Sequence, residues 1–344
     1  MKTKTRVLIV DDSALIRLLL KEILDGDPEI EVIATAEDPI EAREKIKRYN
    51  PDVITLDVEM PKMDGITFLR NLMRLRPMPV VMISTLTAAG ADVTLKALEL
   101  GAFDYICKPS ADIKNSLADY ADDIIEKVKG AARSNVRAAM QPQKIATATP
   151  VSTNDLYEVI AIGASTGGTE AIKQVLKALP VGLPPIVMTQ HIPAAFSTSF
   201  AKRLDSESDI NVFEVTSPME LEPGCAYLAP GDKHLFVRRQ SGRLMGSLLT
   251  SEKVNRHRPA VDVLFQSLAD TCGKKVVCAL LTGMGADGAA GMLDIRNSGG
   301  FTIAQDEASS VVWGMPGAAV AMNAAMKVLP LSKVPAGIIR AISR

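Results

Sequence analysis

Short apolar runs rich in β-branched residues alternate with helical patterns along most of this chain, and this alternation limits the folds that it can adopt. In the first part of the chain the runs occupy residues 7–10, 32–36, 53–56, 80–83 and 105–107. Runs without polar alternation indicate strands buried on both faces, as in parallel sheets covered by helices. These strand–helix units predict a doubly wound α/β domain over residues 1–130.

The same alternation resumes in the second part of the chain, with expected strands at residues 159–162, 186–188 and 276–281. Residues 225–250 differ, because glycine-containing turns separate the strand-like runs there, which favours antiparallel hairpins. We therefore expect a second, mainly parallel, Rossmann-like α/β domain over residues 156–344, with a β-hairpin insertion.

Residues 131–155 separate the two patterns and contain no aromatic residue and few large aliphatic residues. Such a segment cannot bury enough apolar surface to fold, so we interpret it as a flexible linker. The chain has 344 residues, about twice the usual length of one domain, which agrees with two folding units.

The charge balance excludes some classes of partner. The 39 Lys and Arg residues nearly equal the 40 Asp and Glu residues, and aromatic residues make up only 4% of the chain. A near-neutral surface that is poor in aromatic side chains argues against nucleic acid or an anionic membrane as the main partner. The apolar run near the amino terminus is too short for a signal peptide, and no run reaches the length of a membrane span, so we expect a cytoplasmic protein.

Acidic side chains follow two strands of the first predicted domain. Asp11 and Asp12 come directly after the first strand, and Asp57 ends the third. The carboxyl ends of parallel strands meet at one edge of a sheet, where open α/β sheets place their sites. Three neighbouring carboxylates repel one another unless a cation compensates, and oxygen-rich clusters suit Mg²⁺.

Two further polar residues end strands of the same predicted sheet. Ser84 ends the fourth strand and Lys108 the fifth. Each could be an ordinary loop residue, but a hydroxyl and an ammonium group facing a metal-bound carboxylate form a phosphoryl-binding set. In such a set Asp57 would be the attacking nucleophile.

The segments LIVDDS, TLDVEMPKMDG, MIST and YICKPS resemble the response-regulator receiver family, over residues 5–130. The resemblance implies a flavodoxin-like fold, phosphorylation of Asp57 by a histidine kinase, and switch roles for Ser84 and Tyr105. The residues implied to hold Mg²⁺ are Asp12, Asp57 and the carbonyl of Glu59. Many receivers carry Asn or another residue where this chain has Glu59, a difference expected to affect dephosphorylation more than the fold.

In the second predicted domain, the strand at residues 159–162 runs into the turn Gly163-Ala164-Ser165-Thr166-Gly167, and a helical pattern follows. The spacing matches G-x-S-x-G, in which small residues let a sharp turn expose the serine hydroxyl. Glycine-rich turns after strands also bind phosphates or merely reverse the chain, so the motif needs a base nearby.

The chain has three histidines, which makes a choice of base feasible. His191 ends the strand IVMTQ at the same expected sheet edge as Ser165, whereas His234 lies in the hairpin region and His257 in a basic loop. Asp287, in a third strand-to-helix turn, could fix the tautomer of the imidazole. Ser165, His191 and Asp287 therefore form a candidate triad, in an order that differs from ordinary α/β-hydrolases.

Two backbone N–H groups, near Thr166 and Met284, are expected to stabilise the oxyanion. A competing interpretation is a dinucleotide site, because residues 283–288 satisfy G-x-G-x-x-G and Asp306 follows about 20 residues later. This motif lies late in its domain and would leave Ser165 and His191 without a role. A DNA-binding output domain is a further alternative, disfavoured by the near-neutral charge and the lack of clustered Arg and Lys.

The segments GASTGG, QHIP, PGDKHL, NRHRPAVDVLF, LTGMGADGA and SSVVWGMPGAA resemble the chemotaxis protein-glutamate methylesterase family, over about residues 157–344. The resemblance implies hydrolysis of γ-glutamyl methyl esters on chemoreceptors with release of methanol, and deamidation of receptor glutamines in many members. No metal or other cofactor is expected in this domain. A receiver fused to a hydrolase suggests that phosphorylation of Asp57 relieves an inhibition of Ser165.

Overall fold

The computed structural model describes residues 4–85, 87–108, 117–134 and 156–343. The chain divides into two compact units, Met1–Met140 and Gln141–Arg344. Within the described ranges, no helix has both the length and the apolar character needed to cross a bilayer.

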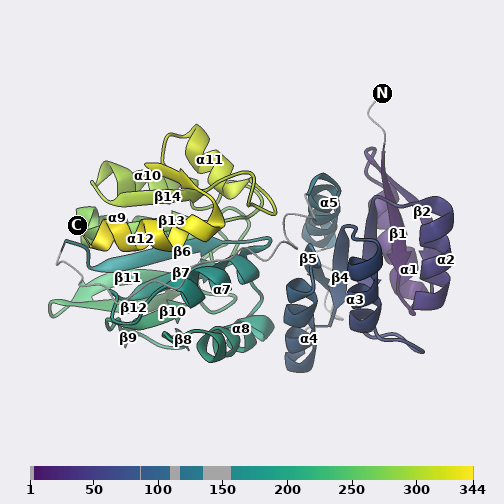
Figure 1. The fold of residues 1–344 in the computed structure, drawn as a ribbon, viewed down its shortest axis with the longest axis horizontal. Helices are drawn as coiled ribbons and strands as arrows, with labels where there is room; N and C mark the ends of the chain where they lie inside the picture. Colours follow the sequence, from purple (N-terminus) through teal and green to yellow (C-terminus); the bar gives the residue numbers. More distant parts are fainter. Residues whose placement is uncertain (1–3, 86, 109–116, 135–155, 344) are drawn as a thin grey trace. The chain divides into compact units, whose positions relative to one another are not determined.

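The first unit is a five-stranded parallel sheet in the order β2-β1-β3-β4-β5 with helices on both faces (Figure 1). Its strands are β1 (Thr5–Val10), β2 (Ile30–Ala36), β3 (Val53–Asp57), β4 (Val80–Ser84) and β5 (Asp104–Cys107). Its helices are α1 (Ala14–Asp25), α2 (Pro39–Tyr49), α3 (Gly65–Leu75), α4 (Ala88–Glu99) and α5 (Leu117–Arg133). The predicted doubly wound fold is confirmed.

Local sequence explains why these helices begin where they do. The side chains of Ser13, Asp38, Asp64 and Thr87 each accept a backbone N–H from the first turn of α1, α2, α3 and α4. Such caps satisfy donors that a helix leaves unpaired at its start. Strands β3 and β4 are buried along their whole length, as expected for central strands of a covered parallel sheet.

The second unit has a seven-stranded sheet in the order β15-β14-β13-β6-β7-β10-β8 and a separate three-stranded sheet in the order β11-β12-β9. The strands are β6 (Val159–Ala164), β7 (Ile186–Gln190), β8 (Asn211–Glu214), β9 (Met219–Glu220), β10 (Cys225–Leu228), β11 (His234–Gln240), β12 (Arg243–Leu249), β13 (Val276–Leu280), β14 (Phe301–Gln305) and β15 (Lys327–Leu329). All pairings in the larger sheet are parallel.

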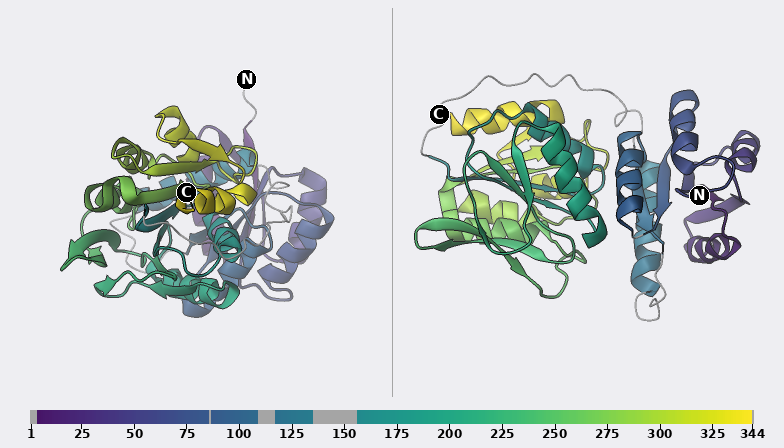
Figure 2. Two further views of the ribbon diagram at one scale, coloured as in Figure 1. Left: turned by 60° about the vertical axis from the view of Figure 1, so that its left-hand side comes forward. Right: turned by 90° about the horizontal axis from the view of Figure 1, so that it is seen from below.

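Helices cover both faces of the larger sheet. They are α7 (Gly168–Ala178), α8 (Ala194–Glu207), α9 (Val261–Cys272), α10 (Ala289–Asn297), α11 (Met315–Ala321) and α12 (Val334–Ile342). Helix α7 contacts α8 and α12, while α10 contacts α9 and α11; α12 and α7 lie side by side in Figure 2. Leu264, Phe265 and Leu268 of α9 are fully buried in the core. This packing fixes the start of α9 beside the carboxyl ends of the strands.

One expected element is wrong. The run at Cys225–Leu228 forms β10, which pairs in parallel with β7 and β8 inside the main sheet, and only β11 and β12 form the antiparallel hairpin. A short apolar run has the same sequence pattern in a parallel and in an antiparallel sheet, so the pattern could not show which kind of pairing residues 225–228 would make.

The predicted linker, residues 131–155, lies largely outside the described residues. Residues 131–133 belong to helix α5, and residues 135–155 are not described. The proposed domain boundaries therefore remain predictions.

Candidate active site and acidic cluster

Ser165 lies at the turn between strand β6 and helix α7. Its backbone N–H donates to the Thr282 carbonyl (3.0 Å), and its carbonyl accepts from the Gly168 N–H (2.6 Å). Gly167 has a φ of 74°, and a Cβ there would lie 2.6 Å from the Val311 side chain. Glycine is therefore needed for the turn that presents the serine hydroxyl.

His191 directly follows strand β7 and brings its imidazole to Ser165. Its Nδ1 lies 3.0 Å from Ser165 Oγ, and its Nε2 lies 2.7 Å from Asp287 Oδ2. Because an ionised carboxylate only accepts hydrogen bonds, Nε2 carries the proton in the neutral imidazole, which leaves Nδ1 to accept the Ser165 proton. The structure thus brings together the three side chains predicted as nucleophile, base and acid.

Asp287 is buried at the amino-terminal end of helix α9. Its Oδ2 accepts from the Val261 N–H (2.6 Å), and its Oδ1 accepts from the Asp262 N–H (3.1 Å) and from Asn255 Nδ2 (2.8 Å). Burial alone would raise the pKa of Asp287, but the hydrogen bonds, led by that from His191, lower it to about 2. A helix amino terminus also favours negative charge, so this carboxylate is held in its ionised form.

The loop that precedes α9 supports the triad, and sequence reasoning assigned no such role to it. The ring of His257 stacks on that of His191, with centroids 3.6 Å apart and an interplanar angle of 15°. Asn255 Nδ2 donates to Asp287 and also to Asp262 Oδ2 (2.8 Å). The polar cluster NRHRP was a possible signal, but no spacing rule connects it with Ser165.

Of the residues predicted near the oxyanion, Thr166 directly follows Ser165 in its turn, and Met284 lies in the loop between β13 and α10. Thr166 Oγ1 is 4.0 Å from Met284 Sδ. Thr166 is buried, whereas Met284 is half-buried. The Ser165 N–H is bonded to the Thr282 carbonyl, so an oxyanion would need donors from neighbouring residues.

The first and last glycines of residues 283–288 have packing roles that require no dinucleotide. A Cβ at Gly283 would lie 2.8 Å from Ser165 Cβ, and one at Gly288, which has a φ of 85°, would lie 2.5 Å from Val261 Cγ1. Asp306, the acid expected of a ribose site, accepts from the backbone N–H of Ser309 (3.0 Å) in a local turn.

In the first unit, the predicted acidic cluster is assembled at the carboxyl edge of the sheet. Ligand oxygens of Asp11, Asp12 and Asp57 all lie within 4.8 Å of one another. Lys108 Nζ lies 2.8 Å from Asp57 Oδ2 and 3.2 Å from Asp11 Oδ2. Burial raises the pKa of Asp57 to about 6, although the hydrogen bond from Lys108 opposes this. One ammonium group thus compensates only part of the negative charge.

These residues fit a hard cation such as Mg²⁺. Asp11 Oδ2 is buried and, apart from its ion pair with Lys108 Nζ (3.2 Å), has no hydrogen-bond donor among the described residues. Three carboxylates with oxygen to spare are the donor set that Mg²⁺ prefers. The backbone N–H of Glu59 lies 3.4 Å from Asp57 Oδ1, and the assignment of its carbonyl as a ligand remains a prediction.

The two predicted switch residues are buried. Ser84 Oγ lies 2.6 Å from the hydroxyl of Thr94 in helix α4. Lys127 Nζ lies 5.4 Å from the centroid of the Tyr105 ring and donates to the Tyr105 carbonyl (2.8 Å). Their switch roles remain predictions.

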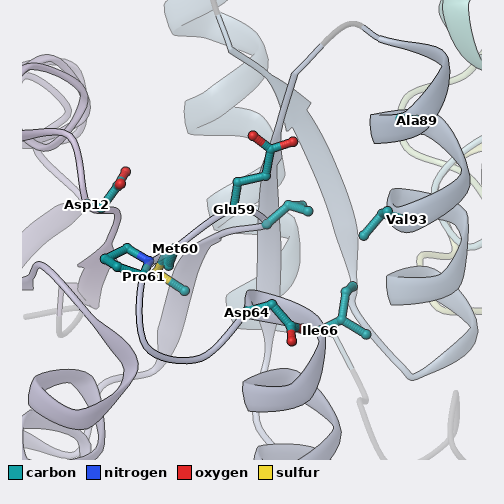
Figure 3. A pocket seen from close by; sticks show the side chains of 9 residues that line it. Asp12, Glu59, Met60, Pro61, Asp64, Ile66, Ala89 and Val93 are labelled. Carbon is teal, nitrogen blue, oxygen red and sulfur yellow. The ribbon is translucent and has the colours of Figure 1, made fainter.

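An open pocket of about 680 Å³ adjoins the acidic cluster. Figure 3 shows Asp12 on one side of this pocket and Val93 of helix α4 on the other. The remaining lining residues are Val58, Glu59, Met60, Pro61, Asp64, Ile66 and Ala89. Of the three acidic residues, Asp12 lines this pocket, whereas Asp11 and Asp57 are buried.

Comparisons with known proteins match both parts of the chain to known families. Residues 160–338 match the protein family described as CheB methylesterase, and residues 7–118 match the response regulator receiver domain. A Saccharophagus degradans protein named protein-glutamate methylesterase/protein-glutamine glutaminase 2 is 54% identical, over 97% of this chain and 98% of that protein. A Vibrio vulnificus protein of the same name is also 54% identical, over 97% of each chain.

Among solved structures, the Thermotoga maritima CheB methylesterase catalytic domain is 38% identical, with a TM-score of 0.53. The match covers 54% of this chain and 99% of that domain. Both the predicted relationship and the predicted enzyme class are confirmed. The chain belongs to the CheB methylesterase family of ester hydrolases and carries a response regulator receiver domain.

Proposed function

We propose that this protein hydrolyses γ-glutamyl methyl esters on methyl-accepting chemoreceptors, with Ser165 as nucleophile. The observation that carries the proposal is the imidazole of His191, which bridges Ser165 Oγ (3.0 Å) and Asp287 Oδ2 (2.7 Å). The names of the 54% identical relatives support the same substrate class.

In the first step, His191 Nδ1 takes the proton of Ser165 as Oγ attacks the ester carbonyl carbon. Asp287 stabilises the imidazolium through the Nε2–H bond. The tetrahedral adduct collapses as the C–O bond to methoxide breaks, and His191 returns the proton so that methanol leaves. Water then attacks the acyl-enzyme with the same base, which releases the glutamate carboxylate and restores Ser165.

Backbone N–H groups near Thr166 and Met284 are proposed to stabilise the oxyanion of both adducts. Thr166 directly follows Ser165 and Met284 lies in the loop after β13, and the contact between Thr166 Oγ1 and Met284 Sδ (4.0 Å) supports their closeness. Donors aimed at a developing oxyanion contribute about 2.7–4 kcal/mol each in other hydrolases.

We also propose that phosphorylation of Asp57 by a chemotaxis histidine kinase raises the rate of hydrolysis. Asp11, Asp12 and Asp57 would hold Mg²⁺, with Glu59 as a further ligand, and the bound ion would neutralise charge on the incoming phosphoryl group. Asp57 supplies the attacking oxygen and Lys108 pairs with the added negative charge. Ser84 and Tyr105 would pass the change to the surface of the receiver domain.

The relatives' names also include glutaminase activity, and the same residues can hydrolyse an amide. His191 would then protonate a leaving amine instead of methoxide. We therefore propose deamidation of receptor glutamines, with ammonia as product, as a second reaction of Ser165.

Methanol release from methylated chemoreceptors in membranes tests the proposal. Wild-type chain should release methanol, and Ser165→Ala should lose this activity by several orders of magnitude while its circular dichroism stays unchanged. Ammonia release from a receptor with glutamines at the same positions tests the second reaction. Methanol release by Ser165→Ala at the wild-type rate would contradict the assignment of the nucleophile.

A further inference from the structure

Gln190, the last residue of strand β7, places a long polar side chain inside the sheet edge that carries the triad. Its side chain is 4% exposed. In the sheet it pairs with Ala164, the residue before Ser165, and it precedes His191 in the chain. Gln190 is thus next to the base in sequence and next to the nucleophile in space.

The amide of Gln190 joins the backbones of the two reacting residues. Its Nε2 donates to the Ser165 carbonyl (2.9 Å) and to the His191 carbonyl (3.1 Å). These two bonds use both hydrogens of the NH₂ group. The orientation of the amide is fixed by them, since a reversed amide would set its oxygen against two carbonyl oxygens.

The oxygen of the Gln190 amide, unlike its nitrogen, makes no hydrogen bond among the described residues. Gln190 Oε1 is buried and lacks a hydrogen-bond partner within the described part of the chain. A buried carbonyl oxygen without a donor costs stability. An apolar side chain of the same length would avoid this cost but would lose both hydrogen bonds to the carbonyls of Ser165 and His191.

Position 168 is shaped to admit the amide. A Cβ at Gly168 would lie 2.1 Å from Gln190 Oε1 and 2.6 Å from Ala164 Cβ. The Gly168 N–H also donates to the Ser165 carbonyl (2.6 Å). The serine carbonyl is therefore held by two donors, one from the start of α7 and one from Gln190.

We propose that Gln190 is a positioning residue, which ties the Ser165 turn to the His191 loop so that Oγ stays within reach of Nδ1. The backbone N–H of Ser165 is bonded in the other direction, to Thr282 after strand β13. Apart from the Gln190 amide, the backbone link next to these two residues is the bond from the His191 N–H to the Ala164 carbonyl (3.2 Å). Loss of the amide would therefore leave the Ser165 turn and the His191 loop joined by fewer bonds. A shift of about 1 Å can cost about 100-fold in rate. The inference rests on the proposed function.

Gln190→Met keeps the length of the side chain and removes both hydrogen bonds. In methanol release we expect kcat to fall by about 10- to 100-fold with KM within about twofold. The matched control is Gln174→Met in helix α7, where Oε1 is likewise buried and, among the described residues, without a partner. The control should keep the wild-type kcat. A folded Gln190→Met with a kcat within about twofold of wild type would overturn the proposal.

Gln190→Glu gives a readout that a merely structural role would not change. Lowering the pH protonates the introduced carboxyl, which then donates to one of the two carbonyls. The ratio of the variant's kcat to the wild-type kcat should therefore rise as the pH is lowered from about 8 to about 5.5. If the ratio of the two kcat values does not change with pH, the proposal is wrong, and this holds even if Gln190→Met does not fold. Failure of the proposed esterase function can be told apart from failure of the Gln190 proposal, because in the first case the wild-type chain itself would release no methanol.

Discussion

The two units place their chemistry at the same kind of sheet edge but give their key aspartates opposite environments. Burial raises the pKa of Asp57 to about 6, and one lysine is shared between it and Asp11. The pKa of Asp287 is lowered to about 2, and both of its oxygens accept hydrogen bonds. At the first site part of the negative charge of the carboxylates is not balanced by Lys108, whereas at the second site hydrogen-bond donors stabilise the charge of Asp287.

The difference follows from what each carboxylate has to do. In the proposed function Asp57 binds a cation and attacks a phosphoryl group, so donors that fully satisfied it would lower its reactivity. Asp287 must stay ionised and keep the imidazole of His191 in one tautomer, which hydrogen bonds from the start of α9 favour.

The largest expected effects come from substitutions that inactivate one of the two sites and leave the other intact. His191→Ala should lower methanol release by about 10⁴-fold or more, and Asp287→Asn by about 10³-fold, because triad members act as a unit. Both variants should take up phosphate from a small phosphodonor at the wild-type rate. Asp57→Ala should show the reverse pattern, with no phosphate uptake and an intact resting esterase. If His191→Ala failed to take up phosphate, the claim that the two sites carry out their chemistry independently would be wrong.

Phosphorylation should give the next largest effect. With Mg²⁺ and a small phosphodonor, methanol release by the whole chain should rise about 10- to 100-fold, the scale of a coupling free energy of about 1.4–2.7 kcal/mol. Asp57→Ala should not respond. If the receiver inhibits the esterase, residues 152–344 alone should be faster than the unphosphorylated whole chain. Equal rates would instead favour a role of the receiver in targeting.

Ligand-dependent stability should differ between the units. Mg²⁺ at about 100 times its dissociation constant should stabilise the first unit by about 2.7 kcal/mol, and Asp57→Asn should weaken this response. NAD or NADP should leave the melting temperature of the second unit unchanged. Differential scanning calorimetry with each ligand measures both effects, and a saturable rise with either dinucleotide would restore the cofactor interpretation of residues 283–288.

Acid should weaken the second unit through Asp287. The pKa of this carboxyl falls from 3.8 to about 2 on folding, so its ionised form stabilises the fold above about pH 4, and this contribution is lost as the pH falls towards 2. The contribution is about 2 kcal/mol. Asp287→Asn should therefore lower stability at pH 7 but differ little from wild type near pH 2. Trp313, the single tryptophan of the chain, reports unfolding of this unit by fluorescence.

The sequence could predict the residues whose positions follow from strand ends. Ser165, His191 and Asp57 each lie where a buried strand ends, and Asp287 lies in the turn between β13 and α10. Parallel strands bring such positions to one edge of a sheet. The correct parallel fold followed from the same runs. The error at β10 arose because the pairing partner of a short apolar strand is set by tertiary packing.

The supporting residues could not be predicted in the same way. Asn255 reaches Asp287 from a left-handed backbone conformation with a φ of 52°, and His257 meets His191 by ring stacking. Neither arrangement has a fixed spacing along the chain. Gln190 was visible beside His191, but its bond to the Ser165 carbonyl depends on strand register and on the space at Gly168.

The most direct test of the triad is the reaction of the whole chain with a fluorophosphonate that labels activated serines. We predict one label on the peptide that contains Ser165, at the same rate in EDTA and in Mg²⁺, and at least about 10³-fold slower labelling in His191→Ala. Labelling of a different residue, or an undiminished rate in His191→Ala, would contradict the assignment of Ser165 and His191 as nucleophile and base.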